Sequence, residues 1–220
     1  MKPDLLLLGD SHTIALEEGA RSLGLDAAAL RYGGNVWHEG KFGWNDNGFF
    51  PKGSNLGRRV LGQMQERLGV KNVFSVGAPV LTTVGFHLGR LTRPFNWFDH
   101  AVMGPGDPAP TSGLLASDAL AEAYVAHFRG AHIRVLKRLS REAKLIVVPP
   151  PAISEEPNFR QLRAIVIRLM QRAGLEVFDA AEALHGAGPV PAHLIEADGQ
   201  HMTAEYGAMV IERLRDEKRI

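Results

Sequence analysis

Hydrophobic positions along the chain follow two alternating patterns. Short apolar runs come at residues 4–8, 27–32, 72–76, 144–148 and 175–179. Longer segments with apolar residues at helical spacing come at residues 13–24, 55–69, 117–143, 158–174 and 203–217. This alternation is typical of βα units, in which helices cover both faces of a parallel sheet. It predicts an α/β fold, a three-layer α/β/α sandwich whose five-stranded parallel sheet has the flavodoxin-like order 2-1-3-4-5.

Two long stretches, residues 33–56 and 78–116, do not fit the alternation. The first mixes glycine, asparagine and aromatic residues, and the second contains the proline-glycine sequence GPGDPAPTSG. We expect both to be long loops near a functional site, because each follows a predicted strand and open α/β sheets bind ligands beyond the carboxyl ends of their strands. No linker divides the chain, so residues 1–220 are expected to form a single domain.

Composition limits the possible partners. Lysine and arginine number 25 and aspartate and glutamate 24, which gives a net charge of +1 and no reason to expect a nucleic acid or an anionic membrane surface. The chain has no cysteine, so disulfides, a thiolate nucleophile and cysteine metal ligands are excluded. No apolar run reaches the roughly 18 residues of a membrane span, and the start MKPDLLLLGD is too short for a signal peptide. These features predict a soluble, cytoplasmic protein of undetermined oligomeric state.

Candidate chemistry begins where the first apolar run ends, at Gly9-Asp10-Ser11-His12. Two kinds of site would use these residues. Ser11 would act as a nucleophile, or Asp10 and His12 would bind a metal ion.

A second candidate group, Asp198 and His201, directly precedes the last helical segment. An acid three residues before a histidine can reach the imidazole in a turn, where it fixes the tautomer and stabilises the imidazolium. The loop after the fifth predicted strand would bring this pair to the same sheet edge as Ser11. Ser11, His201 and Asp198 would then serve as nucleophile, base and orienting acid.

The chain resembles the SGNH/GDSL hydrolase superfamily in three blocks. These are LLLLGDSH on the first strand, YGGN after the second and DGQHMTAEYGAMVIERL before the last helix. The resemblance covers residues 4–214 in order and spacing. It implies a three-layer α/β/α fold and acyl-ester hydrolysis by a serine-histidine-aspartate triad, here Ser11, His201 and Asp198, without metal or organic cofactor.

The resemblance also implies an oxyanion hole built from the nucleophile's own N–H, a glycine N–H after the second strand and an asparagine side chain after the third. Ser11 supplies the first donor, and Gly34 is expected to supply the second, with Gly33 as the other choice. The asparagine is missing: Pro79 stands at its expected position, in the sequence SVGAPVLTT.

Several residues are candidates to replace that asparagine. Asn35, adjacent to the glycine pair, is the nearest, followed by His87 and the pair Thr82 and Thr83. If none of them donates, loss of one oxyanion donor costs about 100- to 1000-fold in rate. A weakened or inactive binding domain for a carbohydrate or acylated ligand is therefore the alternative function.

A metallophosphoesterase is a third and weaker hypothesis. Gly-Asp-x-His begins the ligand set of that family too, but the required Asn-His pair is absent, since GGNV has valine where histidine is needed. We therefore expect no metal. Asp10 is expected to shape the turn or stabilise the helix start, and His12 to line the site or lie on the surface.

The aromatic residues of 33–56 have two equally weighted interpretations: they form the substrate surface, or they pack the long segment onto the domain. Trp37 and Trp44, with neighbouring phenylalanines, would form a platform for an acyl chain or sugar ring, with His87 nearby. The segment 149–156, PPPAISEE, is expected to form a wall of the pocket. The predicted partner is a small-molecule ester or acylated sugar.

Overall fold

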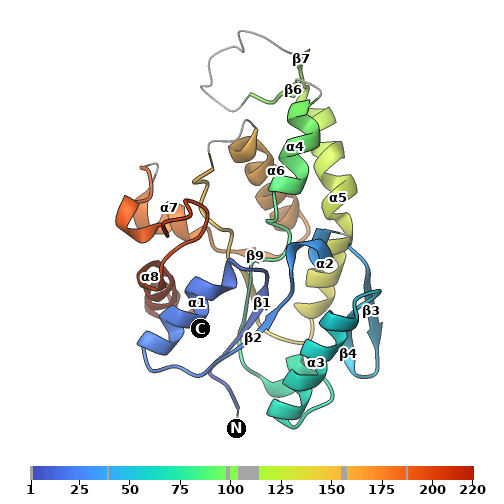
Figure 1. Ribbon diagram of the computed structural model, residues 1–220, viewed down its shortest axis with the longest axis vertical. Helices are drawn as coiled ribbons and strands as arrows, with labels where there is room; N and C mark the ends of the chain where they lie inside the picture. Colours follow the sequence, from blue (N-terminus) through green and yellow to red (C-terminus); the bar gives the residue numbers. More distant parts are fainter. Residues whose placement is uncertain (1, 39, 98–99, 104–113, 155–157, 187) are drawn as a thin grey trace.

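The computed structural model describes residues 2–38, 40–97, 100–103, 114–154, 158–186 and 188–220 (Figure 1). Its main sheet has five parallel strands in the order β2-β1-β5-β8-β9, which confirms the predicted fold class and strand order. The strands are β1 (Leu5–Gly9), β2 (Ala27–Arg31), β5 (Val80–Thr82), β8 (Leu145–Val147) and β9 (Glu176–Val177).

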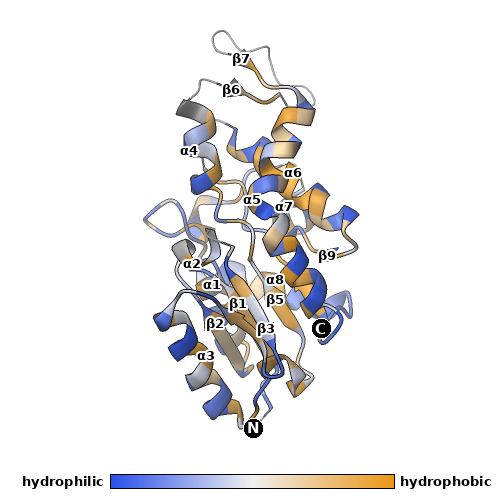
Figure 2. Ribbon diagram, turned by 90° about the vertical axis from the view of Figure 1, so that its right-hand side faces the viewer, coloured by the Kyte–Doolittle hydropathy of each residue, from blue (hydrophilic) through white to orange (hydrophobic). Residues whose placement is uncertain are grey.

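Helices cover both faces of this sheet. They are α1 (Thr13–Ser22), α2 (Gly34–His38), α3 (Asn55–Leu68), α4 (Gly89–Trp97), α5 (Asp118–Leu139), α6 (Phe159–Arg172), α7 (Ala180–His185) and α8 (Ala204–Asp216). The five helical segments predicted from spacing correspond to α1, α3, α5, α6 and α8. In Figure 2, α3 and α8 carry blue, hydrophilic residues alongside orange, hydrophobic ones, as expected for helices with one face on the sheet.

The four leucines of β1 show why the first strand is apolar throughout. Leu5 and Leu7 belong to the core under α1 and α8, whereas Leu6 and Leu8 belong to the core on the opposite face of the sheet. Successive side chains of a strand point to opposite faces, so a strand buried on both sides needs a continuous apolar run. All four are at most 2 % exposed.

Helices α1 and α8 come from opposite ends of the chain and meet through two glycines. A Cβ at Gly19 would lie 2.2 Å from the backbone nitrogen of Ala208, and a Cβ at Gly207 would lie 1.8 Å from the carbonyl oxygen of Ala15. Only glycine permits so close an approach of two helix backbones. This contact holds the segment that precedes α8 beside the segment that precedes α1.

The third predicted strand, residues 72–76, is wrong. These residues form a 3-10 helix, η1 (Val73–Val76), because the Asn72 side chain accepts a hydrogen bond from the Phe74 N–H at 3.1 Å and closes a turn. The third strand of the sheet is β5, which starts after Pro79. The Pro79 carbonyl accepts from the Leu6 N–H at 2.9 Å, at the amino end of β5. Pro79 therefore lies at the opposite end of the strand from the site, and its assignment to the asparagine position is wrong.

The two stretches expected to be long loops contain regular elements. Residues 33–56 hold α2 and an antiparallel hairpin of β3 (Phe42–Asn45) and β4 (Gly48–Pro51). Residues 78–116 hold β5 and α4, followed by the short strands β6 (His100–Ala101) and β7 (Leu114–Leu115). Residues 98–99 and 104–113 lie outside the described part. Within the described residues, no helix is both long enough and apolar enough to cross a membrane.

Candidate active site

The structure brings together the three residues predicted to form a triad. The Ser11 Oγ lies 2.7 Å from the His201 Nε2, and the His201 Nδ1 lies 2.5 Å from the Asp198 Oδ2. The two contacts form one continuous chain of hydrogen bonds from hydroxyl to imidazole to carboxylate. This is the geometry in which a histidine removes the serine proton while the acid holds the ring.

The turn after β1 presents Ser11 at the carboxyl edge of the sheet. Asp10 is buried, and its Oδ1 accepts from the His12 N–H at 3.1 Å and from the Thr83 hydroxyl at 3.3 Å. The turn is tight at Gly9, where a Cβ would lie 2.1 Å from the Thr83 Oγ1. Asp10 thus shapes the turn, as expected from its place before the helix.

The segment before α8 holds Asp198 and His201 in position. Ile195 and Met202 form an antiparallel bridge, and the Thr203 hydroxyl caps α8 by accepting from the Tyr206 N–H. Within the turn between them, the Asp198 Oδ1 accepts from the N–H of Gln200 at 2.8 Å and from that of His201 at 3.0 Å.

These contacts keep Asp198 ionised. The hydrogen bond from the His201 side chain, followed by the two backbone N–H groups, lowers the pKa of Asp198 to about 2. The carboxylate is 48 % exposed, so solvent screens much of this interaction. Its role in the geometry is to orient the His201 ring.

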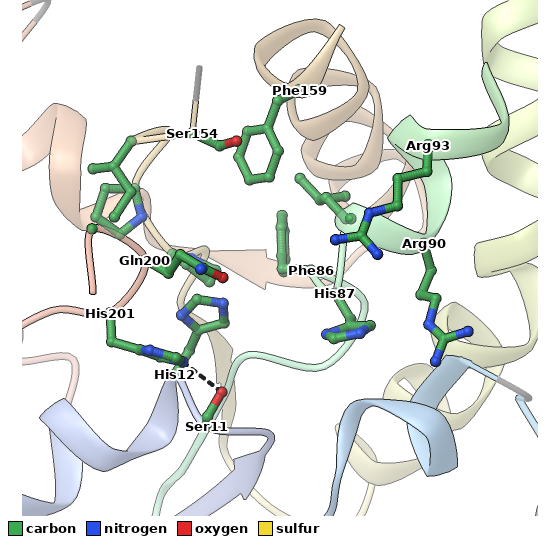
Figure 3. A pocket seen from close by; sticks show the side chains of 16 residues that line it. Ser11, His12, Phe86, His87, Arg90, Arg93, Ser154, Phe159, Gln200 and His201 are labelled. Carbon is green, nitrogen blue, oxygen red and sulfur yellow. Dashed lines mark hydrogen bonds between the residues drawn. The ribbon is translucent and has the colours of Figure 1, made fainter. Parts of the chain in front are cut away.

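A cavity of about 680 Å³ opens beside Ser11 (Figure 3). Its described lining comprises Ser11, His12, Phe86, His87, Leu88, Gly89, Arg90, Arg93, Pro150, Pro151, Ile153, Ser154, Phe159, Gly199, Gln200 and His201. The lining includes 150–151 and 153–154, as predicted for the segment 149–156, of which residues 155–156 lie outside the described part. The size suits a small-molecule ligand.

His12 lines this cavity next to the His201 ring. Their ring centroids are 5.2 Å apart. Burial lowers the pKa of His12, against the opposing effect of the Asp10 charge, so its ring is neutral near pH 7. A neutral His12 adds no positive charge beside His201 when His201 takes a proton. The expectation that His12 lines the site agrees with this position.

His87 follows β5 and lies between Asp10 and Gly34. Its Nδ1 is 3.7 Å from the Asp10 Oδ2, and a Cβ at Gly34 would lie 2.3 Å from the His87 Cε1. Burial opposes ionisation of Asp10, but the interactions with His87 and His12 outweigh it and lower the pKa of Asp10. The segment that follows β5 places Phe86 and His87 at the cavity.

A buried arginine holds the His87 loop. The Arg129 Nε donates to the carbonyl of Gly85 at 2.7 Å and its NH2 group to that of His87 at 2.8 Å. Burial lowers the pKa of Arg129 to about 10, so the guanidinium stays charged near pH 7. The sequence carries a signal for this residue, because Arg129 lies on the buried stripe of α5 at helical spacing from Val125 and Leu136.

The other oxyanion candidates have different positions. Gly33 is exposed and a Cβ there would meet no atom within 4 Å, so the close approach to the cavity wall occurs at Gly34. Asn35 lies in α2, and its side chain is outside the described part. Thr82 and Thr83 are buried, with the Thr83 hydroxyl directed to Asp10. Neither threonine lines the cavity.

The structure places Trp37 and Trp44, predicted to bind substrate, away from this cavity. Trp37 is 2 % exposed, and its Nε1 donates to the carbonyl of Gly9 at 2.9 Å. Trp44 packs on the core, with the Arg138 guanidinium 4.4 Å from its ring centroid. Neither side chain lines the cavity. Their rings instead fasten α2 and the β3–β4 hairpin to the sheet, because large apolar surfaces gain most from burial.

Several residues of the cavity wall were not predicted from the sequence. Arg90 and Arg93 lie on α4, and Phe159 and Gln200 lie on the sides nearer α6 and His201 (Figure 3). Their shared feature is that they follow the carboxyl ends of strands in chain order. The misplaced third strand concealed this relation for the two arginines.

The side chains around Asp10 and His12 bear on the hypothesis that these two residues bind a metal ion. Within the described ranges, no three histidine, aspartate or glutamate side chains gather as a metal-binding group. Asp10 instead faces His87, the Thr83 hydroxyl and the turn backbone.

Comparison of the sequence with protein-family models and with curated proteins finds no match. Among solved structures, the chain is similar to a lipase/acylhydrolase from Enterococcus faecalis, with 14 % identity, a TM-score of 0.45 and coverage of 97 % of this chain and 96 % of that one. It is also similar to an acetylxylan esterase from Geobacillus stearothermophilus, with 14 % identity, a TM-score of 0.48 and coverage of 98 % and 96 %. A GDSL-like lipase from Parabacteroides merdae has 13 % identity, a TM-score of 0.45 and coverage of 100 % and 98 %. At this level of similarity, the activity and substrate of the chain have to be argued from the site itself.

Proposed function

We propose that the protein is a serine-dependent acyl-ester hydrolase. The observation that carries the proposal is the chain of hydrogen bonds from Ser11 through His201 to Asp198 at the mouth of a cavity. A surface turn or a helix cap needs none of these side-chain contacts, whereas nucleophilic catalysis needs all of them.

In the proposed reaction, His201 accepts the Ser11 proton at Nε2 as the Ser11 Oγ attacks the carbonyl carbon of the ester. Asp198 stabilises the imidazolium. His201 then gives the proton to the departing alcohol, which leaves an acyl group on Ser11. Water, deprotonated by His201, attacks this acyl-enzyme and releases the acid. An alcohol in place of that water would make the same site an acyl transferase.

The oxyanion of the tetrahedral intermediate is proposed to be bound by the N–H groups of Ser11 and Gly34 and by the His87 ring. The His87 Nδ1 faces Asp10, so its Nε2 lies on the other side of the ring, where an N–H would be directed away from that carboxylate. Such donors are effective because they are in place before charge develops. His87 thus takes the part that the family resemblance gives to an asparagine.

A serine-reactive fluorophosphonate probe tests the nucleophile. The wild-type protein is expected to take up about one probe per chain, and Ser11→Ala is expected to take up none. Ser154→Ala is the matched control, because Ser154 lines the same cavity but is not a member of the Ser11–His201–Asp198 chain of hydrogen bonds. Ser154→Ala should keep the label. Labelling that persists in Ser11→Ala, or an unlabelled wild type, contradicts the proposal.

Hydrolysis of 4-nitrophenyl esters from acetate to octanoate tests the reaction. The wild type is expected to turn over one or more members of the series between pH 5 and 9, and folded Ser11→Ala none above background. Circular dichroism of both proteins verifies the fold. Equal rates for the two proteins would exclude Ser11 as the nucleophile.

A further inference from the structure

Helix α4 places two arginines on the wall of the cavity beside His87. Arg90 and Arg93 are three residues apart, which puts them one turn apart on the same face of the helix. Both line the cavity that also contains Ser11 and His201, and their guanidinium groups lie on the His87 side of it (Figure 3).

The described lining offers Arg93 no carboxylate. Among those residues there is no aspartate or glutamate, and the polar groups are histidine, serine and glutamine. The two nearby acids of the site face other groups: Asp10 is 4 % exposed behind His87, and Asp198 accepts from His201. Arg93 makes no ion pair with any residue in the described part of the chain.

The amino end of α4 adds to the positive potential. Gly89 and Leu88, at the first turn, line the cavity, so the partial positive charge of the helix start lies on the same wall as the two arginines. This side of the cavity is suited to a negative ligand group. It has two guanidinium groups and a helix start, and the described wall contains no carboxylate.

We propose that the ester cleaved at Ser11 carries an anionic group, a carboxylate or a phosphate, which Arg93 and Arg90 bind on the α4 wall. This inference rests on the proposed hydrolase function. The guanidinium fork matches the paired oxygens of either anion. Binding there fixes the ester against Ser11 and His87 from one side, and the apolar Phe86 and Phe159 contact its uncharged part.

Paired esters that differ in charge test the inference. On the acyl side, mono-4-nitrophenyl glutarate is compared with 4-nitrophenyl valerate, which ends in methyl where the glutarate ends in carboxylate. On the alcohol side, 4-acetoxybenzoate is compared with 4-acetoxybenzamide, and 4-acetoxyphenyl phosphate distinguishes a phosphate from a carboxylate. The measured quantity is the kcat/KM of the anionic ester divided by that of its neutral partner.

Substitution of the arginines should lower this ratio. Arg93→Gln is expected to lower the ratio of kcat/KM values about 10-fold for at least one pair of esters. The double variant Arg90→Gln/Arg93→Gln is expected to lower the ratio further, since each substitution removes a charge-assisted hydrogen bond. Comparing each variant with the wild type cancels the different intrinsic reactivity of the esters. Arg59→Gln is the control, because Arg59 is an exposed arginine of α3 outside the cavity lining.

The possible failures are distinguishable. If the wild type hydrolyses neutral esters through Ser11 but every variant has the wild-type ratio for all anionic esters, the anion site is wrong and the hydrolase proposal stands. If the wild type hydrolyses none of these esters and takes up no fluorophosphonate, both proposals fail. An equal loss of ratio in Arg59→Gln would assign the effect to net charge and overturn the site.

Discussion

Substitution of Gly207 by alanine tests whether the contact between α1 and α8 positions the candidate site. Ser11 stands before α1, and His201 stands before α8. Their hydrogen bond therefore depends on the distance between the two helices. A Cβ at Gly207 would lie 1.8 Å from the carbonyl oxygen of Ala15, which is backbone and cannot rotate away.

The geometry gives the size of the effect. An ordinary Cβ contact begins near 3.4 Å, so the helices must separate by about 1.6 Å. Overpacking of this kind costs about 3 kcal/mol at its upper range. Alanine recovers about 1 kcal/mol through its helix propensity. The net loss of about 2 kcal/mol lowers the Tm by roughly 4–8 °C in a chain of this length.

The same separation affects the chemistry. A misplacement of about 1 Å in a catalytic group can cost roughly 100-fold in rate. Gly207→Ala is therefore expected to lower kcat by about 100-fold below its Tm, where the protein is still folded. Thermal unfolding followed by circular dichroism and 4-nitrophenyl ester hydrolysis at 25 °C measure the two effects.

Gly62→Ala is the matched control. Gly62 is also inside a helix, α3, but a Cβ there would meet no atom within 4 Å. Only helix propensity changes, so Gly62→Ala should raise stability by about 0.5–1 kcal/mol and leave hydrolysis unchanged. If Gly207→Ala behaves like Gly62→Ala in both assays, close packing of α1 against α8 does not position His201, and the reasoning is refuted.

Three further variants test individual groups. Asp198→Asn should lower kcat by about 10²–10⁴ with little change in fold. Because the wild-type pKa of Asp198 is about 2, protonation of Asp198 cannot produce a fall in rate between pH 9 and 4. A fall in rate toward acid pH within this range that disappears in Asp198→Asn would contradict the low pKa of Asp198. His87→Ala should lower kcat about 100- to 1000-fold, and His87→Asn should recover part of the lost rate because its amide N–H can donate to the oxyanion. Equal rates for the wild type and His87→Ala would show that His87 is not part of the oxyanion hole. Arg129→Met leaves the buried carbonyl of Gly85 and the partly buried carbonyl of His87 without their donor and should destabilise the protein by about 2–5 kcal/mol in urea unfolding. A loss below about 0.5 kcal/mol would mean that the loop at Gly85 does not depend on Arg129.

The sequence predicts those parts of the fold in which the hydrophobic pattern is compatible with only one kind of secondary structure. The segments of α1, α3, α5, α6 and α8 are long enough for their helical spacing to be distinct. The leucines of β1 are apolar on both faces, which indicates a central strand. Together these elements determine the strand order through right-handed crossovers.

The errors come from short apolar segments and from aromatic residues. The run at residues 72–76 is apolar because Val73 and Phe74 enter the core from a 3-10 helix, and five residues are too few to distinguish that from a strand. Trp37 could not be placed because an aromatic ring near glycines serves equally to bind a ligand or to hold a segment on the core. Only the buried hydrogen bond from the Trp37 Nε1 to the Gly9 carbonyl shows that the ring belongs to the core.

Correction of the third strand also changes the argument about activity. The alternative of a weakened binding domain depended on Pro79 at the position of an oxyanion donor. After β5 ends at Thr82, the chain continues through two residues to Gly85-Phe86-His87, which has a histidine where the Gly-x-Asn block of the resemblance has an asparagine. Histidine can donate a hydrogen bond and proline cannot. If His87 is the donor that we propose, the departure from the family pattern exchanges one donor for another, and the loss of activity inferred from Pro79 is no longer expected. The Arg129 side chain donates to the His87 carbonyl, and the His87 ring faces Asp10.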